Sequence, residues 1–429
     1  MLPAEAMSKG LELARELFET IGRDSFDGSG FARAAYGPGE ELAHDRVAAA
    51  AAALGMRIER DAARNTWMTL EGEDRDGPPL VIGSHLDAVP NGGNYDGLAG
   101  VLAGLACAAA FRHAAVEPIR SLSVLAIRAE ESAWFGAQHV GSRALLGTLS
   151  DGVLDTARRV DSGRTLREHM IEAGADMVPI GQGRPLRDPA GIAAFLELHI
   201  EQGPVLTRAD APLGIVTGIR GNRRCRRIRC QGESGHSGTL ERADRHDAVL
   251  AVCDLITTME AFWDEVAADG EDLVMTFGKL STNAATHSVT TVPGEVELSF
   301  DARSHSPDVL AHVENRLHAE MDRVAASRGV AFDHDPFTGD PPIAMNAGMR
   351  KLLERGSTQL GIPAISISSG AGHDAGDFAM AGVPSAMIFV RSENGSHNPD
   401  EHMAFNDFAE GVRLVSWFVE EFQQMAGPW

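Results

Sequence analysis

The stretch LVIGSHLDAVPNGGNYDGLAG, from Leu80 to Gly100, holds the features on which the interpretation of the fold depends. Its first residues form a short apolar run that ends at a glycine, which predicts a buried strand. His85, Asp87 and Asp96 then surround a segment rich in Asn and Gly. A turn needs Asn and Gly, but it does not need an imidazole and two carboxylates. These three side chains therefore indicate a functional site directly after a strand.

Other apolar runs along the chain also end near polar side chains. The run 121–129 is followed by Glu130 and Glu131, and the run 195–203 contains His199. Helical patterns alternate with these strands, which is typical of an α/β sheet covered by helices on both faces. In such sheets, ligands bind beyond the carboxyl ends of the strands. The sequence therefore predicts an α/β domain with a mixed central sheet and a site at that edge.

The middle of the chain has a different pattern. From residue 213 to residue 330, several strands and two long helices follow one another in the manner of an α+β unit with a largely antiparallel sheet. The α/β pattern then resumes. A chain of 429 residues also exceeds what one hydrophobic core normally supports. We therefore expect residues 213–330 to form a domain inserted between the two parts, 1–212 and 331–429, of the first domain.

The composition argues against several classes of partner. The formal net charge of −23 disfavours nucleic acid and anionic membrane, and no apolar stretch is long enough to span a bilayer. The basic run 220–230 lacks interleaved aromatic residues, so it is interpreted as the polar face of a strand or an arginine-rich subunit interface. Only 4 cysteines occur, which indicates reduced thiols in a cytoplasm. Cys225 and Cys230 have no second pair nearby, so we interpret them as strand residues rather than zinc ligands.

His, Asp and Glu side chains are the natural ligands of a catalytic divalent metal such as zinc. A single His at a strand end is more often a hydrogen-bonded structural residue, so each candidate is weak alone. The argument rests on the complete set, which consists of His85, Asp96, Glu130, Glu131, His199 and His397. Two adjacent glutamates are costly to hold together unless they have different functions. One of them can bind metal while the other stays free as a base.

The chain resembles the metal-dependent amidohydrolases that include N-carbamoyl-L-amino acid hydrolases, β-ureidopropionases and allantoate amidohydrolases. These proteins are grouped with aminoacylases and carboxypeptidases that use a two-metal centre. The resemblance follows the family's order over nearly the whole chain. The segments that carry it are GSHLDAVPNGGNYDGLAGVLAG (83–104), RAEESAWFG (128–136), ELHIEQGPVL (197–206), GESGHSGT (232–239), VPGEVELSFDARS (292–304), SGAGHDAGDFA (369–379) and SHNPDE (396–401).

The resemblance implies two divalent metal ions in each subunit. His85 and His199 would bind one ion. Glu131 and His397 would bind the other, and Asp96 would bridge the two. Zinc fits these ligands best, and manganese, cobalt or nickel would be accepted by the same nitrogen and oxygen donors.

The resemblance also assigns residues that support the chemistry. Glu130 would be the general base that takes a proton from a metal-activated water. Asp87 would hydrogen-bond the far nitrogen of His85 and fix its tautomer. Gly92 and Gly93 would let the chain turn, so that the residues after them can reach the metal site.

Substrate contacts are implied as well. Gln202 would offer its amide to a ureido group, unless it only caps a turn. His236 would stabilise the oxyanion from the other subunit of a homodimer, unless it is only an interface residue. Arg303 would bind the substrate carboxylate, unless it pairs with Asp301 or another carboxylate. The backbone groups expected to approach the ligand closely are those of Gly370, Ala371 and Gly372.

One departure from the family concerns the substrate. Where the family commonly reads Asn-Val-Ile-Pro-Gly, this chain reads TTVPG, so that Thr290 stands at the position of a substrate-binding Asn. Either Thr290 or a neighbour such as Asn283 or His287 takes over that contact, or the substrate differs. The metal ligands are not affected by this change.

The expected activity is hydrolysis of the linear ureido (N-carbamoyl) amide of a small amino-acid-like acid. The product side would include ammonia and carbon dioxide, and the substrate would be an N-carbamoyl amino acid or allantoate. The alternative is a two-metal aminoacylase or dipeptidase that acts on an ordinary amide. A non-catalytic binding protein is disfavoured because the ligand set and the base are intact. The first domain would then be catalytic, and the inserted domain would serve dimerisation or act as a lid.

Overall fold

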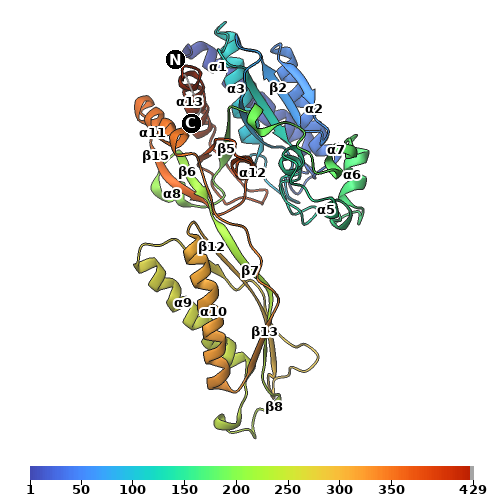
Figure 1. Ribbon diagram of the computed structural model, residues 1–429, viewed down its shortest axis with the longest axis vertical. Helices are drawn as coiled ribbons and strands as arrows, with labels where there is room; N and C mark the ends of the chain where they lie inside the picture. The colour runs from blue at the N-terminus through green and yellow to red at the C-terminus, as the bar shows by residue number, and fades with distance from the viewer. Residues whose placement is uncertain (426–429) are drawn as a thin grey trace. The chain divides into compact units, whose positions relative to one another are not determined.

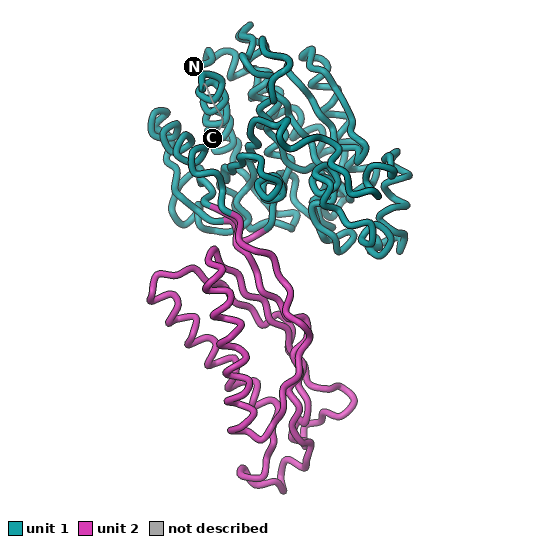
Figure 2. Tube along the Cα trace, viewed as in Figure 1, with its two compact units in different colours: residues 1–217, 344–368, 372–429 teal, residues 218–343, 369–371 magenta. Residues whose placement is uncertain are grey.

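The computed structural model describes residues 1–425, so the last four residues of the expected catalytic domain lie outside the described part. The chain divides into two compact units (Figure 2). Unit 1 comprises residues 1–217, 344–368 and those from 372 onward, and unit 2 comprises residues 218–343 and 369–371.

Unit 1 is built on a mixed nine-stranded sheet with the order β1-β2-β4-β3-β5-β16-β6-β14, and β15 pairs with β6. Its strands are β1 (Arg57–Arg60), β2 (Thr66–Leu70), β3 (Leu80–His85), β4 (Leu122–Ile127), β5 (Ala194–Ile200), β6 (Leu213–Ile219), β14 (Ile343–Ala344), β15 (Ala364–Ser369) and β16 (Ser385–Val390). Its helices are α1 (Ala4–Ser25), α2 (Pro38–Ala53), α3 (Leu98–His113), α4 (Val140–Leu145), α5 (Asp151–Thr156), α6 (Leu166–Glu172), α7 (Met177–Gly181), α8 (Val205–Ala209), α11 (Ala347–Leu360), α12 (Asp374–Met380) and α13 (Phe405–Gln423), with a 3₁₀ turn at Pro189–Gly191.

The four central strands β4, β3, β5 and β16 are neighbours and run parallel. Every residue of these strands is buried, as is usual for parallel strands covered on both faces. This explains why they read as continuous apolar runs rather than as alternating patterns. Because the strands are parallel, their carboxyl ends lie at the same edge of the sheet. The predicted α/β fold with a mixed central sheet is confirmed.

Helix α3 lies against β3 and β5, and α1 and α13 pack on it in turn (Figure 1). Its residues from Leu98 to Phe111 are all buried. A helix surrounded by protein on all sides is apolar around its whole circumference, which accounts for its Ala, Gly and Leu composition. The helix begins directly after the Asp96 turn, so this packing fixes the position of that turn.

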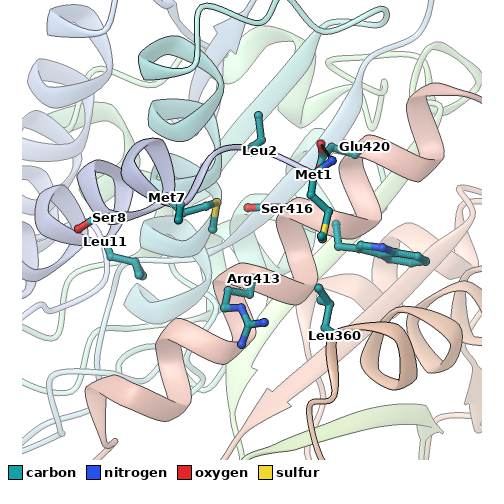
Figure 3. A pocket seen from close by; sticks show the side chains of 11 residues that line it. Met1, Leu2, Met7, Ser8, Leu11, Leu360, Arg413, Ser416 and Glu420 are labelled. Atoms are coloured by element: carbon teal, nitrogen blue, oxygen red, sulfur yellow. Dashed lines mark ion pairs between the residues drawn. The ribbon is translucent and has the colours of Figure 1, made fainter.

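Helices α1, α11 and α13 line a pocket of about 430 Å³ (Figure 3). Met7, Leu11 and Trp417 contribute apolar surface to it. The amino terminus of Met1 forms an ion pair with Glu420 at 2.9 Å beside it. None of the residues that line this pocket belongs to the predicted site.

Unit 2 has a five-stranded antiparallel sheet with the order β10-β12-β7-β13, in which β9 also pairs with β12. The strands of this sheet are β7 (Gly221–Gln231), β9 (Val274–Thr276), β10 (Leu280–Thr282), β12 (Glu295–Ser304) and β13 (Ala331–His334). Two further strands, β8 (Gly235–His236) and β11 (Thr291–Val292), pair with each other. The helices of the unit are α9 (Ala248–Ala268) and α10 (Pro307–Arg328), with a 3₁₀ turn at Arg242–Asp244. The two helices pack together against the sheet, and their apolar residues share one core with it (Figure 1). The predicted α+β unit with an antiparallel sheet is confirmed.

The basic run of unit 2 is the strand β7, and its arginines pair with acidic residues on neighbouring strands. Arg224 lies 2.7 Å from Asp301 on β12, and Arg229 lies 2.8 Å from Asp333 on β13. The positive charge of this strand is therefore largely compensated within the sheet. Cys225 is in the core of the unit, and no group of possible metal ligands in residues 1–425 contains a cysteine.

The boundaries of the units differ from those expected at residues 213 and 330. Strand β6 was expected to open the inserted domain, but it pairs with β16 in the large sheet. The residues of β13 were assigned to the catalytic domain, but this strand pairs with β7 of unit 2. Main-chain pairing with distant strands decides both cases, and the local sequence pattern does not contain that information. No helix within residues 1–425 is long and apolar enough to cross a membrane.

Candidate active site

The carboxyl edge of the central strands brings together the predicted metal ligands and the predicted base. His85 ends β3, the two glutamates follow β4, and His199 lies near the end of β5. The full set is His85, Asp96, Glu130, Glu131, His199 and His397, and all but His397 are buried. Their possible ligand atoms form three overlapping groups, and the atoms within each group lie within 4.8 Å of one another.

The first group is a triangle of His85, His199 and Asp96. The Nε2 atoms of the two histidines are 3.3 Å apart. Oδ1 of Asp96 lies 3.3 Å from Nε2 of His85 and 3.1 Å from Nε2 of His199. Two zinc bonds of 2.0–2.1 Å at a tetrahedral angle separate their ligand atoms by about 3.3–3.4 Å. The triangle therefore has the size that a shared metal ion requires.

Hydrogen bonds at the far side of each ring fix where the imidazole protons are. Nδ1 of His85 lies 3.1 Å from the carbonyl oxygen of Asp87, and Nδ1 of His199 lies 2.9 Å from that of Ile200. A carbonyl oxygen only accepts, so each Nδ1 carries a proton and donates it, and Nε2 is the nitrogen that faces the other ligand atoms and can bind a metal ion in place of a proton. Oδ1 of Asp96 is buried and receives no hydrogen bond. Three lone-pair donors facing one another in a buried place fit a cation.

The pKa values of the cluster also indicate a site that favours a cation. Burial lowers the pKa of His199, but the negative charge of Asp96 outweighs burial and raises it to about 9. Burial, together with the charges of Glu130 and Asp96, raises the pKa of Glu131 to about 7 against the opposing effect of His397. The carboxylates of the cluster therefore favour positive charge at the site, which a metal ion can supply. Its nitrogen and oxygen donors suit zinc, manganese, cobalt or nickel.

The second group lies on the other side of Asp96. Oδ2 of Asp96 is 3.6 Å from Nε2 of His397, and this nitrogen is 3.2 Å from Oε1 of Glu131. The two oxygens of Asp96 therefore face different groups, which is the arrangement a bridging carboxylate needs. Gln202 donates to the same Oδ2 at 2.9 Å, and its amide also contacts His397 at 3.2 Å. Ser396 donates to Oδ2 as well, at 2.6 Å.

The turn that carries Asp96 depends on close packing. Gly97 has a φ of 68°, and a Cβ at this position would lie 2.4 Å from the ring of His85. Gly92 and Gly93 were expected to permit the turn itself, but neither has a positive φ. A Cβ at Gly93 would instead lie 2.3 Å from the carboxyl group of Glu401. These positions are therefore small because side chains pack against the turn.

Asp87 connects the two strand ends. Its Oδ1 accepts a hydrogen bond from the backbone N–H of Glu130 at 3.0 Å, and its Oδ2 accepts one from that of Glu131 at 3.1 Å. Oδ1 also lies 3.3 Å from Nδ1 of His85. Asp87 therefore faces Nδ1 of His85 with both its backbone carbonyl oxygen and its carboxylate, and Nδ1 is the nitrogen that it was predicted to contact. The two backbone contacts were not predicted, and they fix the positions of the glutamates.

Glu130 belongs to neither of these two groups, although its carboxylate lies near His85 and Glu131 in the third. Its Oε2 is 3.9 Å from Nε2 of His85, farther than the atoms of the triangle are from one another. Burial raises the pKa of Glu130, but the charges of His85 and His139 and a hydrogen bond from His139 outweigh it and lower the pKa to about 2. The side chain is therefore ionised at neutral pH, as a proton acceptor must be.

The remaining predicted residues lie mostly in unit 2. His236 is exposed on β8, where its backbone pairs with β11, and the carbonyl of Thr290 accepts a hydrogen bond from Ser237 at 2.9 Å. Arg303 donates to Asp301 at 2.8 Å and to the carbonyl oxygen of Gly370 at 2.6 Å. The structure thus places His236 next to Thr290, and Arg303 next to Gly370.

The glycine-rich segment is divided between the units. Gly370 and Ala371 belong to unit 2, whereas Gly372 belongs to unit 1. The possible substitutes for the family's Asn have partners of their own, because Asn283 donates to Glu295 at 3.1 Å and His287 contacts Thr282 at 2.6 Å.

Comparison with known proteins shows the family to which this architecture and site belong. The profile of peptidase family M20/M25/M40 matches residues 81–421. The chain belongs to peptidase family M20/M25/M40. The matched region contains every predicted metal ligand, from His85 to His397.

Individual relatives specify the branch of the M20 family. The chain is 33% identical to an N-carbamoyl-L-amino-acid amidohydrolase of Paenarthrobacter aurescens, over 92% of this chain and 94% of the relative. It is 32% identical to an allantoate amidohydrolase of Escherichia coli K12, over 85% and 86% of the two chains. The crystal structure of a hydantoinase/carbamoylase family amidase from Burkholderia ambifaria matches with a TM-score of 0.86 and 29% identity, over 97% of each chain. The resemblance predicted from the sequence is confirmed, and the chain is an amidohydrolase of the M20 family.

Two side chains of this M20 site were not predicted. Glu401 accepts hydrogen bonds from the backbone N–H groups of Tyr95 and Asp96, at 2.8 and 3.1 Å. It ends the segment SHNPDE, so its place among other polar site residues was an available signal. His139 contacts Glu130 at 3.2 Å, and no pattern in the sequence around it indicated this.

Proposed function

We propose that this protein hydrolyses the C–N bond of a linear N-carbamoyl (ureido) group on a small amino-acid-like acid. The observation that carries the proposal is the buried triangle of His85, His199 and Asp96 with the carboxylate of Glu130 beside it. The relatives named for N-carbamoyl-L-amino acids and for allantoate support the substrate class.

Different residues of the chain would bind the metal ions and transfer the proton. His85, His199 and Asp96 would hold one divalent ion, and Asp96 would share a second ion with Glu131 and His397. When bound, such ions lower the pKa of water and polarise the carbonyl to be attacked. Glu130 would accept the proton from the attacking water and pass it to the leaving nitrogen.

Candidate substrate-binding residues are found in unit 1 and in unit 2, and each unit is considered by itself. Gln202 carries its amide beside Asp96 and His397, where it can meet the ureido group. Arg303 uses two of its N–H donors within unit 2, and a guanidinium has five, so donors remain for a substrate carboxylate. Thr290 and the backbone of Gly370 and Ala371 would complete these contacts.

His236 would stabilise the oxyanion. The backbone N–H of Gly238 donates to its Nδ1 at 3.2 Å. A neutral imidazole that accepts at Nδ1 carries its proton on Nε2, which is then the donor that an oxyanion needs. Because His236 is exposed on unit 2, we propose that it acts on the site of the other subunit in a homodimer. We also propose a reducing, cytoplasmic location, since all 4 cysteines are free thiols.

The nature of the leaving group tests the function. Protein loaded separately with zinc and manganese is incubated with N-carbamoyl α- and β-amino acids, allantoate, N-acetyl amino acids and dipeptides. We expect ammonia from at least one ureido compound and slower or no cleavage of the others. Rapid cleavage of N-acetyl amino acids or dipeptides without ammonia from any ureido compound would show an aminoacylase or dipeptidase instead.

Shared sites predict complementation between subunits. His236→Ala and Glu130→Gln subunits, each nearly inactive alone, should regain part of the wild-type activity when they are co-expressed, because a mixed dimer contains one site with both residues. Co-expression of two differently tagged Glu130→Gln chains is the control, and it should stay inactive. Absence of rescue would show that each subunit uses its own His236.

A further inference from the structure

The imidazole of His139 lies between two carboxylates in the interior of unit 1. Its Nε2 is 3.2 Å from Oε1 of Glu130, and its Nδ1 is 2.6 Å from Oδ2 of Asp377 on α12. All three side chains are buried. Neither His139 nor Asp377 belongs to any of the groups that could hold a metal ion in residues 1–425.

The main chain fixes His139 next to Glu130 as well. The N–H of His139 donates to the carbonyl oxygen of Glu130 at 2.8 Å, and that of Val140 donates to Ala129 at 2.9 Å. His139 and Ala129 have φ values of 53° and 52°, which are unfavourable for residues with a side chain. Such strain persists only where the surrounding structure imposes it, and it is common at active sites.

The space for the ring comes from Gly372. A Cβ at this position would lie 2.8 Å from Cε1 of His139 and 3.0 Å from its Nε2. His139 directly precedes α4, which packs against the α12 helix that carries Asp377. Two packed helices and a glycine thus hold the ring in one place.

The contacts of Glu130 differ between its two oxygens. Oε1 faces His139, whereas Oε2 faces His85 and the proposed metal ligands. A carboxylate held at one oxygen cannot rotate freely, so the other oxygen stays directed at the place where water would be activated. Burial lowers the pKa of His139, but its contacts with Asp377 and Glu130 outweigh burial and raise it well above its usual value. The ring can therefore donate from both nitrogens.

We propose that His139, held by Asp377, is a positioning residue that orients the Glu130 carboxylate for proton transfer. This inference rests on the proposed function, because it concerns the base of that reaction. An ion pair that only stabilises the fold would affect folding and not turnover, and the experiments below separate the two roles.

Kinetics of two variants give the first test. His139→Gln and Asp377→Asn should lower kcat by about 10–100-fold, which is typical for residues that orient a functional group. KM should change less than about threefold and metal content should stay that of the wild type, since neither residue contacts the ligand groups. His169→Gln is the matched control, because the buried ring of His169 contacts Ser162 at 2.9 Å and Phe135, away from the site, and this variant should retain the wild-type kcat. An unchanged kcat in His139→Gln, or loss of metal, would overturn the proposal.

The second test does not depend on activity. In metal-free protein labelled with ¹⁵N-histidine, the resonances missing from His139→Gln identify the ring of His139. We expect ¹⁵N shifts of a ring protonated at both nitrogens, and both Glu130→Gln and Asp377→Asn should move them. Shifts insensitive to Glu130→Gln would contradict the proposal even if the hydrolase activity is real. If the wild type cleaves none of the amides, the proposed function fails, and with it the catalytic role of His139, even where the shifts show the contact.

Discussion

Replacement of Glu130 by Gln is expected to lower kcat by about 10²–10⁴-fold, the usual contribution of a general base. The amide has nearly the same shape as the carboxylate but cannot accept the proton of the attacking water. Oε2 of Glu130 lies 3.9 Å from Nε2 of His85, outside the triangle of close ligand atoms, so metal binding should be retained. KM should change little for the same reason. Steady-state kinetics and metal analysis of the purified variant measure both quantities.

The neighbouring residue provides a matched control. Glu131→Gln makes the same chemical change one position along the chain, but Oε1 of Glu131 lies 3.2 Å from His397 in the second ligand group. This variant should therefore lose metal as well as activity. Equal metal loss in both variants would show that the two glutamates do not have separate functions. Activity near the wild-type level in Glu130→Gln would remove this residue from the mechanism.

The separate roles of Glu130 as base and Glu131 as metal ligand could be predicted from the position of the two residues in the sequence. An apolar run ends immediately before them, as it does before His85, and parallel strands bring such ends to one edge. The fold class follows from the same apolar runs, since strands buried on both faces leave a continuous pattern. The ligand set could be predicted because each ligand is a polar residue at the end of such a run or in a loop, and because the family resemblance ordered them.

The contacts that could not be predicted join residues far apart in the chain. Asp377 meets His139 only because α12 packs on α4, and Glu401 reaches Asp96 across most of the sequence. The same limit explains the unit boundaries, where β6 and β13 pair with strands outside the segments to which their local pattern assigned them. Local patterns specify which element forms, while the partner of that element depends on packing elsewhere.

Loss of the bridging carboxylate should have the second large effect. Asp96 faces one ligand group with Oδ1 and the other with Oδ2, so Asp96→Ala removes a ligand from both proposed ions at once. We expect metal content to fall from two ions per subunit to one or none, and activity to fall below detection. Asp247→Ala is the control, because Asp247 caps α9 in unit 2, and its loss should cost about 1 kcal/mol of stability without changing metal content.

Chelation tests the same site without a mutation. Metal-free wild-type protein should be inactive and should regain activity with zinc or manganese. It should also unfold at a lower temperature, because an ion present at a hundredfold excess over its Kd stabilises the folded state by about 2.7 kcal/mol. In Asp96→Ala this metal-dependent shift of Tm should shrink or vanish, whereas Asp247→Ala should keep it. Full activity in protein shown to be free of metal would overturn the assignment, because Glu130 would then act on water that no ion activates.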